Sequence, residues 1–366
     1  MYYLYYCNST YQLLNILNLH WHRNNGFESI NDYRADLIIQ NSFEGADQIA
    51  QIMRNENIFT DVLLIDKTYN NGAFHKIQTL LDIFSPSLYM KTKHGIRRSE
   101  IANHYDVLCA PKYTILVDQI WRLNKRAQLH LIEDGIGSYH LNLPFEPKSS
   151  MYRKVRNFLK CNRFEDYKYL YLVNRNMFLG KNEDRVVELP KFNKEYLNYV
   201  RTLFVPFYTG YEEKDIYWLS QFLNNEEFNK MVAEILECLA EYKDDVLFCQ
   251  HPRTPMPNIH GFAQTDGRQI WELQVLSMND ISKKLFISIH STACFSAKML
   301  FDEEPYIIMF YKMGDKVVTH ATDNFELAVN RFISSYKNPE KVMLPESMDE
   351  LKNCIKKYVK EVLSLH

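Results

Sequence analysis

Short apolar runs alternate with longer amphipathic segments along the first 140 residues. Runs with the length of buried strands occupy residues 2–7, 36–41, 61–66, 106–111 and 128–134. Between them, apolar residues at helical spacing predict helices over 11–21, 46–55 and 74–84. Strands that alternate with helices are typical of βαβ units, so this part predicts a mostly parallel sheet with helices on both faces.

The alternation weakens between about 141 and 195, where Pro144, Pro147 and many charged residues suggest a long connection. It then resumes, with strands expected at 202–207, 245–250, 285–290 and 306–311. Helices are expected near 213–224, over 226–242, from about 292 and over 347–365. Ser347 is a candidate N-cap for the last helix, because Glu350 follows it at the spacing of a capping box.

The length of the chain, 366 residues, suggests two domains, since a single compact domain is usually shorter. We place their boundary within 180–200 and predict an N-terminal domain over 1–190 and a C-terminal domain over 191–366. The sequence therefore predicts an α/β protein of two Rossmann-like domains that face one another across a cleft, with a C-terminal helix.

The composition, with 46% hydrophobic and 24% charged residues, is that of a folded protein and excludes disorder as a class. The net charge of −2 gives no global argument for a nucleic-acid partner. Seven cysteines, odd in number and never spaced Cys-x-x-Cys, suit reduced thiols better than disulfides or a zinc site.

The chain shows no sign of membrane insertion. Its beginning lacks the basic and long apolar segments of a signal peptide, and no apolar run approaches the ~20 residues that span a bilayer. We therefore expect a cytoplasmic protein. The basic segments 91–100 and 151–164 and the lysines of 347–365 would allow peripheral contact with anionic lipid, but ordinary solvated faces explain each of them better.

Polar residues follow three of the expected strands. They are Glu133-Asp134-Gly135 after 128–132, His251-Pro252-Arg253 after 245–250, and His290-Ser291-Thr292 after 285–289. Ligands of open α/β sheets bind beyond the carboxyl ends of the strands, so all three clusters are candidate sites.

The acid pair Glu133 and Asp134 could be a general base with a supporting partner, or ligands of a metal ion. Gly135 and Gly137 would let the backbone turn sharply and pass close to a ligand. Solvated acids at a strand-end turn explain this motif equally well when it is taken alone.

The other two clusters suit a phosphate group. His251, next to Arg253, could bind a phosphate and give it a proton, although a single loop histidine more often has no ligand. Ser291 or Thr292 could cap the following helix, whose free N–H groups would bind phosphate; a plain N-cap is the commoner case. Together the three clusters suit group transfer from a phosphate-bearing donor to an acceptor hydroxyl.

In their order, these clusters resemble the acidic-acidic-Gly, His-Pro and Ser-Ser/Thr motifs of bacterial sialyltransferases. The likeness is to the lipooligosaccharide sialyltransferases of glycosyltransferase family 52 and, next, to the capsule polysialyltransferases. The segment CNSTYQLLN (7–15) is also similar to the start of that family, but Tyr11 stands where the family has proline.

The resemblance implies a GT-B fold, CMP-sialic acid as donor, a cell-surface glycan as acceptor, and inversion at the anomeric carbon without a metal or other cofactor. By motif position, Glu133 would be the general base and Asp134 would support it. His251 would contact the CMP phosphate and act as the acid. The other donor-site residues would be Pro252, Arg253, Ser291 and Thr292.

Two other functions stay open at this point. The chain could transfer a different sugar from a donor such as a UDP-hexose, or it could be a non-catalytic glycan-binding protein of the same fold. A dimer is compatible with the sequence.

Overall fold

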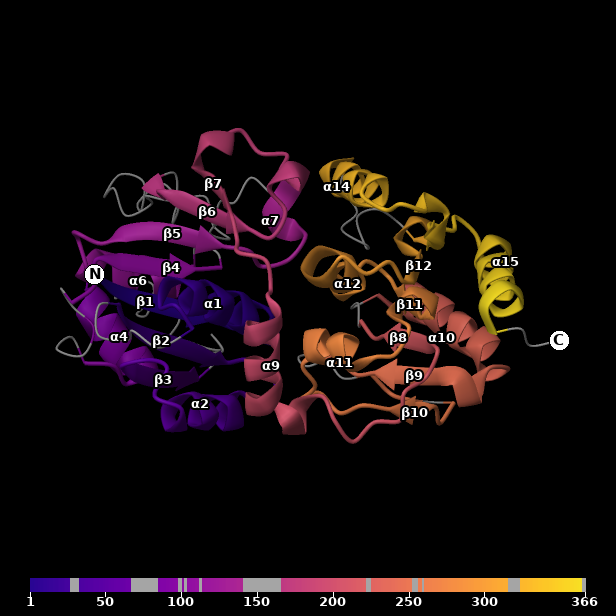
Figure 1. Ribbon diagram of the computed structural model, residues 1–366, viewed down its shortest axis with the longest axis horizontal. Helices are drawn as coiled ribbons and strands as arrows, with labels where there is room; N and C mark the ends of the chain where they lie inside the picture. The colour runs from indigo at the N-terminus through magenta and orange to yellow at the C-terminus, as the bar shows by residue number, and fades with distance from the viewer. Residues whose placement is uncertain are drawn as a thin grey trace. The chain divides into compact units, whose positions relative to one another are not determined.

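The computed structural model describes residues 1–26, 33–66, 85–97, 101, 104–111, 114–140, 166–221, 225–251, 256–258, 260–314 and 323–363. The chain forms two compact units, Met1–Lys191 (unit 1) and Phe192–His366 (unit 2). Each unit is built around one parallel sheet (Figure 1). The helix expected at 74–84 and the basic segment 151–164 lie outside the described residues.

The described sheet of unit 1 has seven strands in the order β3-β2-β1-β4-β5-β6-β7, which Figure 1 shows from bottom to top. These strands are β1 (Tyr2–Cys7), β2 (Arg34–Asn41), β3 (Asp61–Asp66), β4 (Val107–Ala110), β5 (Gln128–Ile132), β6 (Tyr169–Leu172) and β7 (Val186–Glu188). The α-helices described in this unit are α1 (Thr10–Arg23), α2 (Ala46–Asn55), α4 (Pro86–His94), α6 (Ile115–Leu123) and α7 (Gly137–His140).

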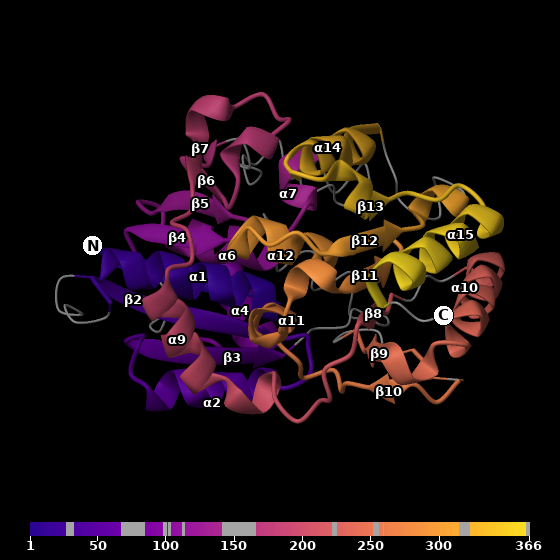
Figure 2. The ribbon, with the colours of Figure 1, turned by 45° about the vertical axis from the view of Figure 1, so that its right-hand side comes forward.

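The described sheet of unit 2 has six strands in the order β10-β9-β8-β11-β12-β13 (Figure 2). They are β8 (Ile216–Leu219), β9 (Val246–Cys249), β10 (Ala263–Gln264), β11 (Leu285–Ser288), β12 (Tyr306–Met309) and β13 (Val342–Met343). The α-helices described here are α9 (Lys194–Leu203), α10 (Glu226–Ala240), α11 (Trp271–Ser277), α12 (Ala293–Phe301), α14 (Asp323–Ser334) and α15 (Met348–Tyr358).

The apolar runs form strands because helices cover both faces of a parallel sheet and every strand position can be buried. In β1, Leu4 and Tyr5 point to opposite faces and both are fully buried. Ser9 then begins α1, since its Oγ accepts the N–H of Gln12 at 3.3 Å. The turn from β1 into α1 therefore has a fixed geometry at the carboxyl end of the sheet.

Both units have the Rossmann strand order, in which the first strand is central and the order reverses beside it. The expected fold class, two Rossmann-like α/β domains, is therefore confirmed. The reversal lies between β1 and β4 in unit 1 and between β8 and β11 in unit 2. Sheets of this kind bind ligands beyond the carboxyl ends of the strands at this switch point.

Two elements expected in unit 2 are wrong. The strand expected at 202–207 is the end of α9 followed by a 3₁₀ turn, because Asn193 caps the helix through the N–H of Tyr196 and Pro206 cannot donate to a sheet. The helix expected near 213–224 contains β8, the central strand. Ile216 and Leu219 have helical spacing, but all four residues of β8 are buried, as in a central parallel strand.

The last predicted helix begins at the N-cap that the sequence indicates, but its α-helical part is shorter than expected. Ser347 caps α15, and its Oγ accepts the N–H of Glu350 at 3.2 Å. The carboxylate of Glu350 accepts the N–H of Glu346 rather than that of Ser347, so the capping box is displaced by one residue. The α-helix ends at Tyr358, and a π-helical turn follows over Val359–Leu363.

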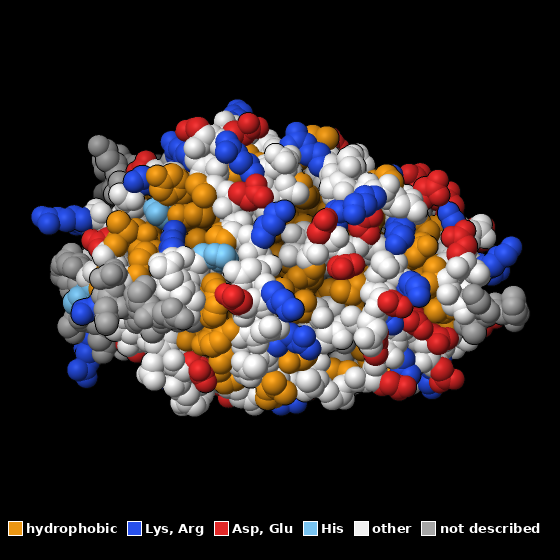
Figure 3. Space-filling view, viewed as in Figure 1, with side chains coloured by type: hydrophobic (Ala, Val, Ile, Leu, Met, Phe, Trp, Pro, Cys, Tyr) orange, Lys and Arg blue, Asp and Glu red, His pale blue; other side chains and the backbone are white. Residues whose placement is uncertain are grey.

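The surface, the helices and the cysteines bear on the expected partners of the protein. On the face drawn in Figure 3, basic and acidic side chains are interspersed in both units. Within the described residues, every helix is too short or too polar to cross a membrane. The six cysteines that the structure describes are free thiols.

Candidate active site

Glu133 lies at the centre of a buried hydrogen-bond network in unit 1. Its carboxylate accepts hydrogen bonds from the hydroxyls of Tyr11 and Tyr139, and from the N–H of Val173 at 2.7 Å. The side chain is completely buried. Burial raises the pKa of Glu133 to about 7, against the three hydrogen bonds, which lower it. An acceptor molecule could reach this carboxylate only by displacing one of its donors.

Asp134, the second acid, is partly exposed. Its carboxylate accepts a hydrogen bond from the side-chain amide of Gln12. The other end of this amide accepts the N–H of Asn8 at 2.7 Å, so the orientation of Gln12 is fixed from both sides. Asp134 is therefore both oriented by the protein and accessible from outside.

The two glycines of this motif shape the turn after β5. Gly135 has φ +102°, a backbone conformation that favours glycine. Gly137 begins the short helix α7, and the N–H of Asp134 donates to Ser138 Oγ in its first turn at 2.8 Å. The turn is thus closed by a hydrogen bond between its own residues, and Asp134 in it is partly exposed.

In unit 2, two residues that follow the central strand β8, Ser220 and Gln221, form hydrogen bonds with the loops of two predicted motifs. Ser220 Oγ accepts the N–H of His251, beyond β9, at 2.8 Å. Gln221 Oε1 accepts the hydroxyl of Ser288 at 2.9 Å and the N–H of His290 at 3.1 Å, beyond β11. Because β8 lies between β9 and β11, these bonds fix both loops at the switch point. Pro252 and Arg253 lie outside the described residues.

Ser291 and Thr292 form the entry to α12. Ser291 Oγ accepts the N–H of Ala293 at 3.2 Å, whereas Thr292, at the N-cap position, has helical backbone angles and makes no capping bond. The expected capping is thus carried out by Ser291. Both side chains are partly exposed, and the Ser291 hydroxyl can still donate a hydrogen bond to an anion at the start of the helix.

Glu272 is a buried acid next to this cluster that the sequence did not single out. The indole N–H of Trp271 donates to the carbonyl of Ala293 at 2.8 Å, which joins the start of α11 to the start of α12. Glu272 Oε2 is buried and has no hydrogen-bond partner in the described part of the chain. Burial raises the pKa of Glu272 to about 7. Perturbed acids of this kind are concentrated at functional sites.

The sequence also missed Tyr11, Gln12, Ser220 and Gln221. The last two would have been found if β8 had been recognised, because they follow it as the predicted motifs follow their own strands. Tyr11 and Gln12 lie in the segment CNSTYQLLN, whose resemblance to the start of the family predicts no role for either residue. Across the described residues, no group of three or more His, Cys, Asp and Glu side chains is placed to hold a metal ion.

No protein-family model and no curated protein matches the chain. Among solved structures, it is similar to the UDP-GlcNAc 2-epimerase from Neisseria meningitidis bound to UDP-GlcNAc, with a TM-score of 0.50 and 12% identity over 100% of both chains. It is also similar to the UDP-GlcNAc 2-epimerase from Methanocaldococcus jannaschii (TM-score 0.48, 13% identity, 100% of this chain and 93% of that one).

A further likeness is to the sialyltransferase from Photobacterium damsela (TM-score 0.43, 10% identity, 94% of this chain and 81% of that one). TM-scores below 0.5 are too low to inform function. The Neisseria meningitidis likeness, at 12% identity, concerns the fold alone. The chain has a GT-B-type fold, with two Rossmann-like units that each contain a parallel sheet.

Proposed function

We propose that the protein is an inverting sialyltransferase, which moves sialic acid from CMP-sialic acid to a hydroxyl of a cell-surface glycan such as lipooligosaccharide or capsule. The observation that carries this proposal is a set of hydrogen bonds at the end of β8. Ser220 binds the His251 loop there, and Gln221 binds the loop before Ser291. These loops contain two of the three motifs that resemble the sialyltransferases. They lie at the switch point, where a Rossmann sheet binds its ligand.

Unit 2 would bind the donor. The start of α12 offers a positive helix end to the CMP phosphate, together with the hydroxyls of Ser291 and Thr292. His251 would donate a proton or a strong hydrogen bond to a phosphate oxygen as CMP leaves. Glu272, whose Oε2 has no partner among the described residues, would accept a hydrogen bond from a hydroxyl of the donor. Pro252 and Arg253, which follow His251 in the sequence, remain proposed donor-site residues.

Unit 1 would activate the acceptor, and we assign the general base to Asp134 rather than to Glu133. A base must come within about 2.6–3.2 Å of the hydroxyl whose proton it takes. Glu133 is fully buried and has three donors, whereas Asp134 is partly exposed. Glu133 is then a positioning residue that holds Tyr11 and Tyr139. This assignment exchanges the roles that motif position suggested.

The proposed reaction is a single displacement. The acceptor oxygen forms a bond to the anomeric carbon, and its proton goes to the Asp134 carboxylate. The bond between the anomeric carbon and the phosphate oxygen breaks on the opposite face, and CMP leaves with both bonding electrons. An oxocarbenium-like transition state needs a base and a stabilised leaving group on opposite faces of the sugar.

A transfer assay tests this proposal. The full chain is incubated with CMP-sialic acid and lipooligosaccharide or capsule oligosaccharide, with no metal added, and released CMP and sialylated product are measured. We expect both to form, and to be lost in Asp134→Asn. Turnover of UDP-hexoses without turnover of CMP-sialic acid would instead identify a hexosyltransferase. Glycan binding without turnover of any donor would identify a binding protein.

A further inference from the structure

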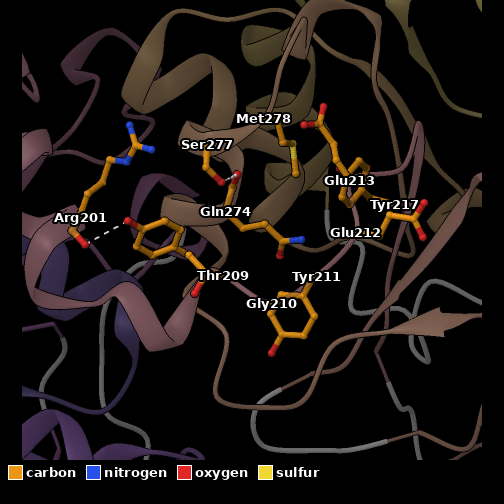
Figure 4. Close-up of a pocket in the computed structure, with 11 residues that line it drawn as sticks. Arg201, Thr209, Gly210, Tyr211, Glu212, Glu213, Tyr217, Gln274, Ser277 and Met278 are labelled. Atoms are coloured by element: carbon orange, nitrogen blue, oxygen red, sulfur yellow. Dashed lines mark hydrogen bonds between the residues drawn. The ribbon is translucent and has the colours of Figure 1, made fainter.

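A cavity of about 350 Å³ lies in unit 2, away from the motif loops. Its lining comes from α9, from β8 and the segment that precedes it, and from α11 with the residue after it (Figure 4). Residues 208–213 lie before the start of β8, and Ser277 and Met278 lie before the start of β11. The cavity is therefore at the amino ends of these strands, whereas the motif loops are at their carboxyl ends.

The cavity contains a buried amide whose oxygen has no partner among the described residues. Gln274 is 6% exposed, and its side-chain Oε1 makes no hydrogen bond in the described part of the chain. Figure 4 shows this side chain extending from α11 into the space beside Tyr211. Buried amide groups are normally hydrogen-bonded, and an amide offers two donors and one acceptor. The position suits a ligand with hydroxyl groups, which can both donate and accept.

Three aromatic side chains line the cavity together with Gln274. They are Tyr208, Tyr211 and Tyr217. Tyr208 is oriented by its hydroxyl, which donates to the carbonyl of Arg201 at 3.1 Å. Tyrosine rings next to a polar amide present an apolar face beside hydrogen-bonding groups, the combination that a sugar ring requires.

The charges around the cavity compensate one another. Glu213 pairs with Lys284 at 2.8 Å and accepts the N–H of Asn279 at 3.0 Å. Arg201 and the exposed Glu212 supply one charge of each sign. The lining therefore favours a neutral ligand over an anion or a cation.

We propose that this cavity is a second carbohydrate site, which binds a neutral sugar unit of a glycan outside the transfer site. Its volume lies at the lower end of the about 300–1,000 Å³ of ligand pockets, which suits one or two sugar rings. The choice of a glycan rests on the proposed function, but the site does not depend on which nucleotide sugar is the donor. A glycan held here would raise the local concentration of acceptor ends near the enzyme.

Saturation-transfer NMR on the full chain tests the site, with lactose, maltose, cellobiose and chitobiose as probes. We expect at least one of them to bind at millimolar concentration. Gln274→Leu and Tyr211→Ala should each weaken this binding at least tenfold, while Tyr211→Phe, which keeps the ring, should change it less than threefold. Gln269→Leu is the matched control, because Gln269 is also a buried amide with an unpartnered oxygen but does not line the cavity.

Three results would overturn the proposal. The first is that none of the four disaccharides binds. The second is that binding survives in Gln274→Leu and Tyr211→Ala, when circular dichroism shows that both variants are folded. The third is that binding is lost in Asp134→Asn. A CMP titration of the same samples separates the two proposals. CMP binding without disaccharide binding rejects the cavity site alone, and disaccharide binding without CMP binding rejects the donor site alone.

Discussion

Units 1 and 2 share a strand order but hold their polar groups in different ways. In unit 1, the side chain of Glu133 is itself the centre of the network and is closed off by Tyr11 and Tyr139. In unit 2, Ser220 and Gln221 bind mainly the backbone N–H groups of the neighbouring loops. Unit 1 thus holds an acid side chain inside a buried network, whereas unit 2 holds the backbone of two loops.

This difference suggests that the two units have different chemical roles, proton transfer in unit 1 and phosphate binding in unit 2. A general base is a single side chain that must be held in one orientation. The Gln12 amide holds Asp134, the proposed base, in this way. A phosphate site needs several donors from separate loops, and a central strand that binds both loops can supply them together.

The largest effect is expected from the acid pair of unit 1. Asp134→Asn should lower kcat by about 10²–10⁴, because it removes the proposed base while keeping the size of the side chain. Glu133→Gln should have a smaller effect on kcat, since its partners still position the chain. Transfer rates of the two variants at saturating donor measure the difference. A larger loss in Glu133→Gln would return the base to Glu133.

The second effect concerns the buried acid of unit 2 and the pH dependence of stability. The pKa of Glu272 is about 7 in the folded protein against an ordinary 4.5, so the folded state binds more protons between these values. The free energy of unfolding should therefore fall as pH rises from 4.5 to 7, by about 3 kcal/mol from this group alone. Glu272→Gln should remove that part of the slope.

Urea unfolding at several pH values measures this slope. Glu303→Gln serves as the control, because Glu303 is exposed and its removal should leave the slope unchanged. An equal pH dependence in Glu272→Gln and the unmodified protein would contradict the assignment of a perturbed pKa to this acid.

The third effect concerns the hydrogen bonds that Gln221, after β8, makes with the loop beyond β11. Gln221→Leu removes the acceptor that holds Ser288 and His290, so the CMP dissociation constant should rise about 10–100-fold. Gln51→Leu, which changes an exposed glutamine of α2, is the matched control and should leave CMP affinity unchanged. If CMP affinity is the same in both variants, the loops do not depend on β8.

The smallest effect is expected at Tyr11. Tyr11→Phe removes one of three hydrogen bonds to Glu133, so the pKa of this acid should rise further and stability at pH 8 should fall by about 1 kcal/mol. A titration of Glu133 by ¹³C NMR in both proteins measures the shift. A lower pKa in the variant would show that Tyr11 does not donate to this carboxylate.

Much of the fold could be predicted from periodicity, because strands buried on both faces leave continuous apolar runs. β1 and β3 have the predicted bounds, and β9, β11 and β12 lie within theirs. β8 was not predicted because a run of four apolar residues fits either a strand or a helix, and two of the four, Ile216 and Leu219, have helical spacing. β6 and β7 are short strands among many charged residues, so their apolar signal was weak.

The site was predictable only in part. The rule that ligands bind at strand ends pointed to Glu133, Asp134, His251 and Ser291. Sequence alone could not tell which acid of the pair is buried, because adjacent residues differ in exposure only through the turn that Gly135 makes. Ser220 and Gln221 act through contacts between separate strands, which spacing along one segment does not reveal.

Binding of CMP by unit 2 through the His251 and Ser291 loops underlies the proposed function. Isothermal titration of the full chain with CMP and with UDP, without added metal, measures this binding. We expect tighter binding of CMP than of UDP, at least tenfold weaker CMP binding in His251→Ala, and unchanged CMP binding in Asp134→Asn. Tighter binding of UDP, or CMP binding that His251→Ala leaves unchanged, would contradict it.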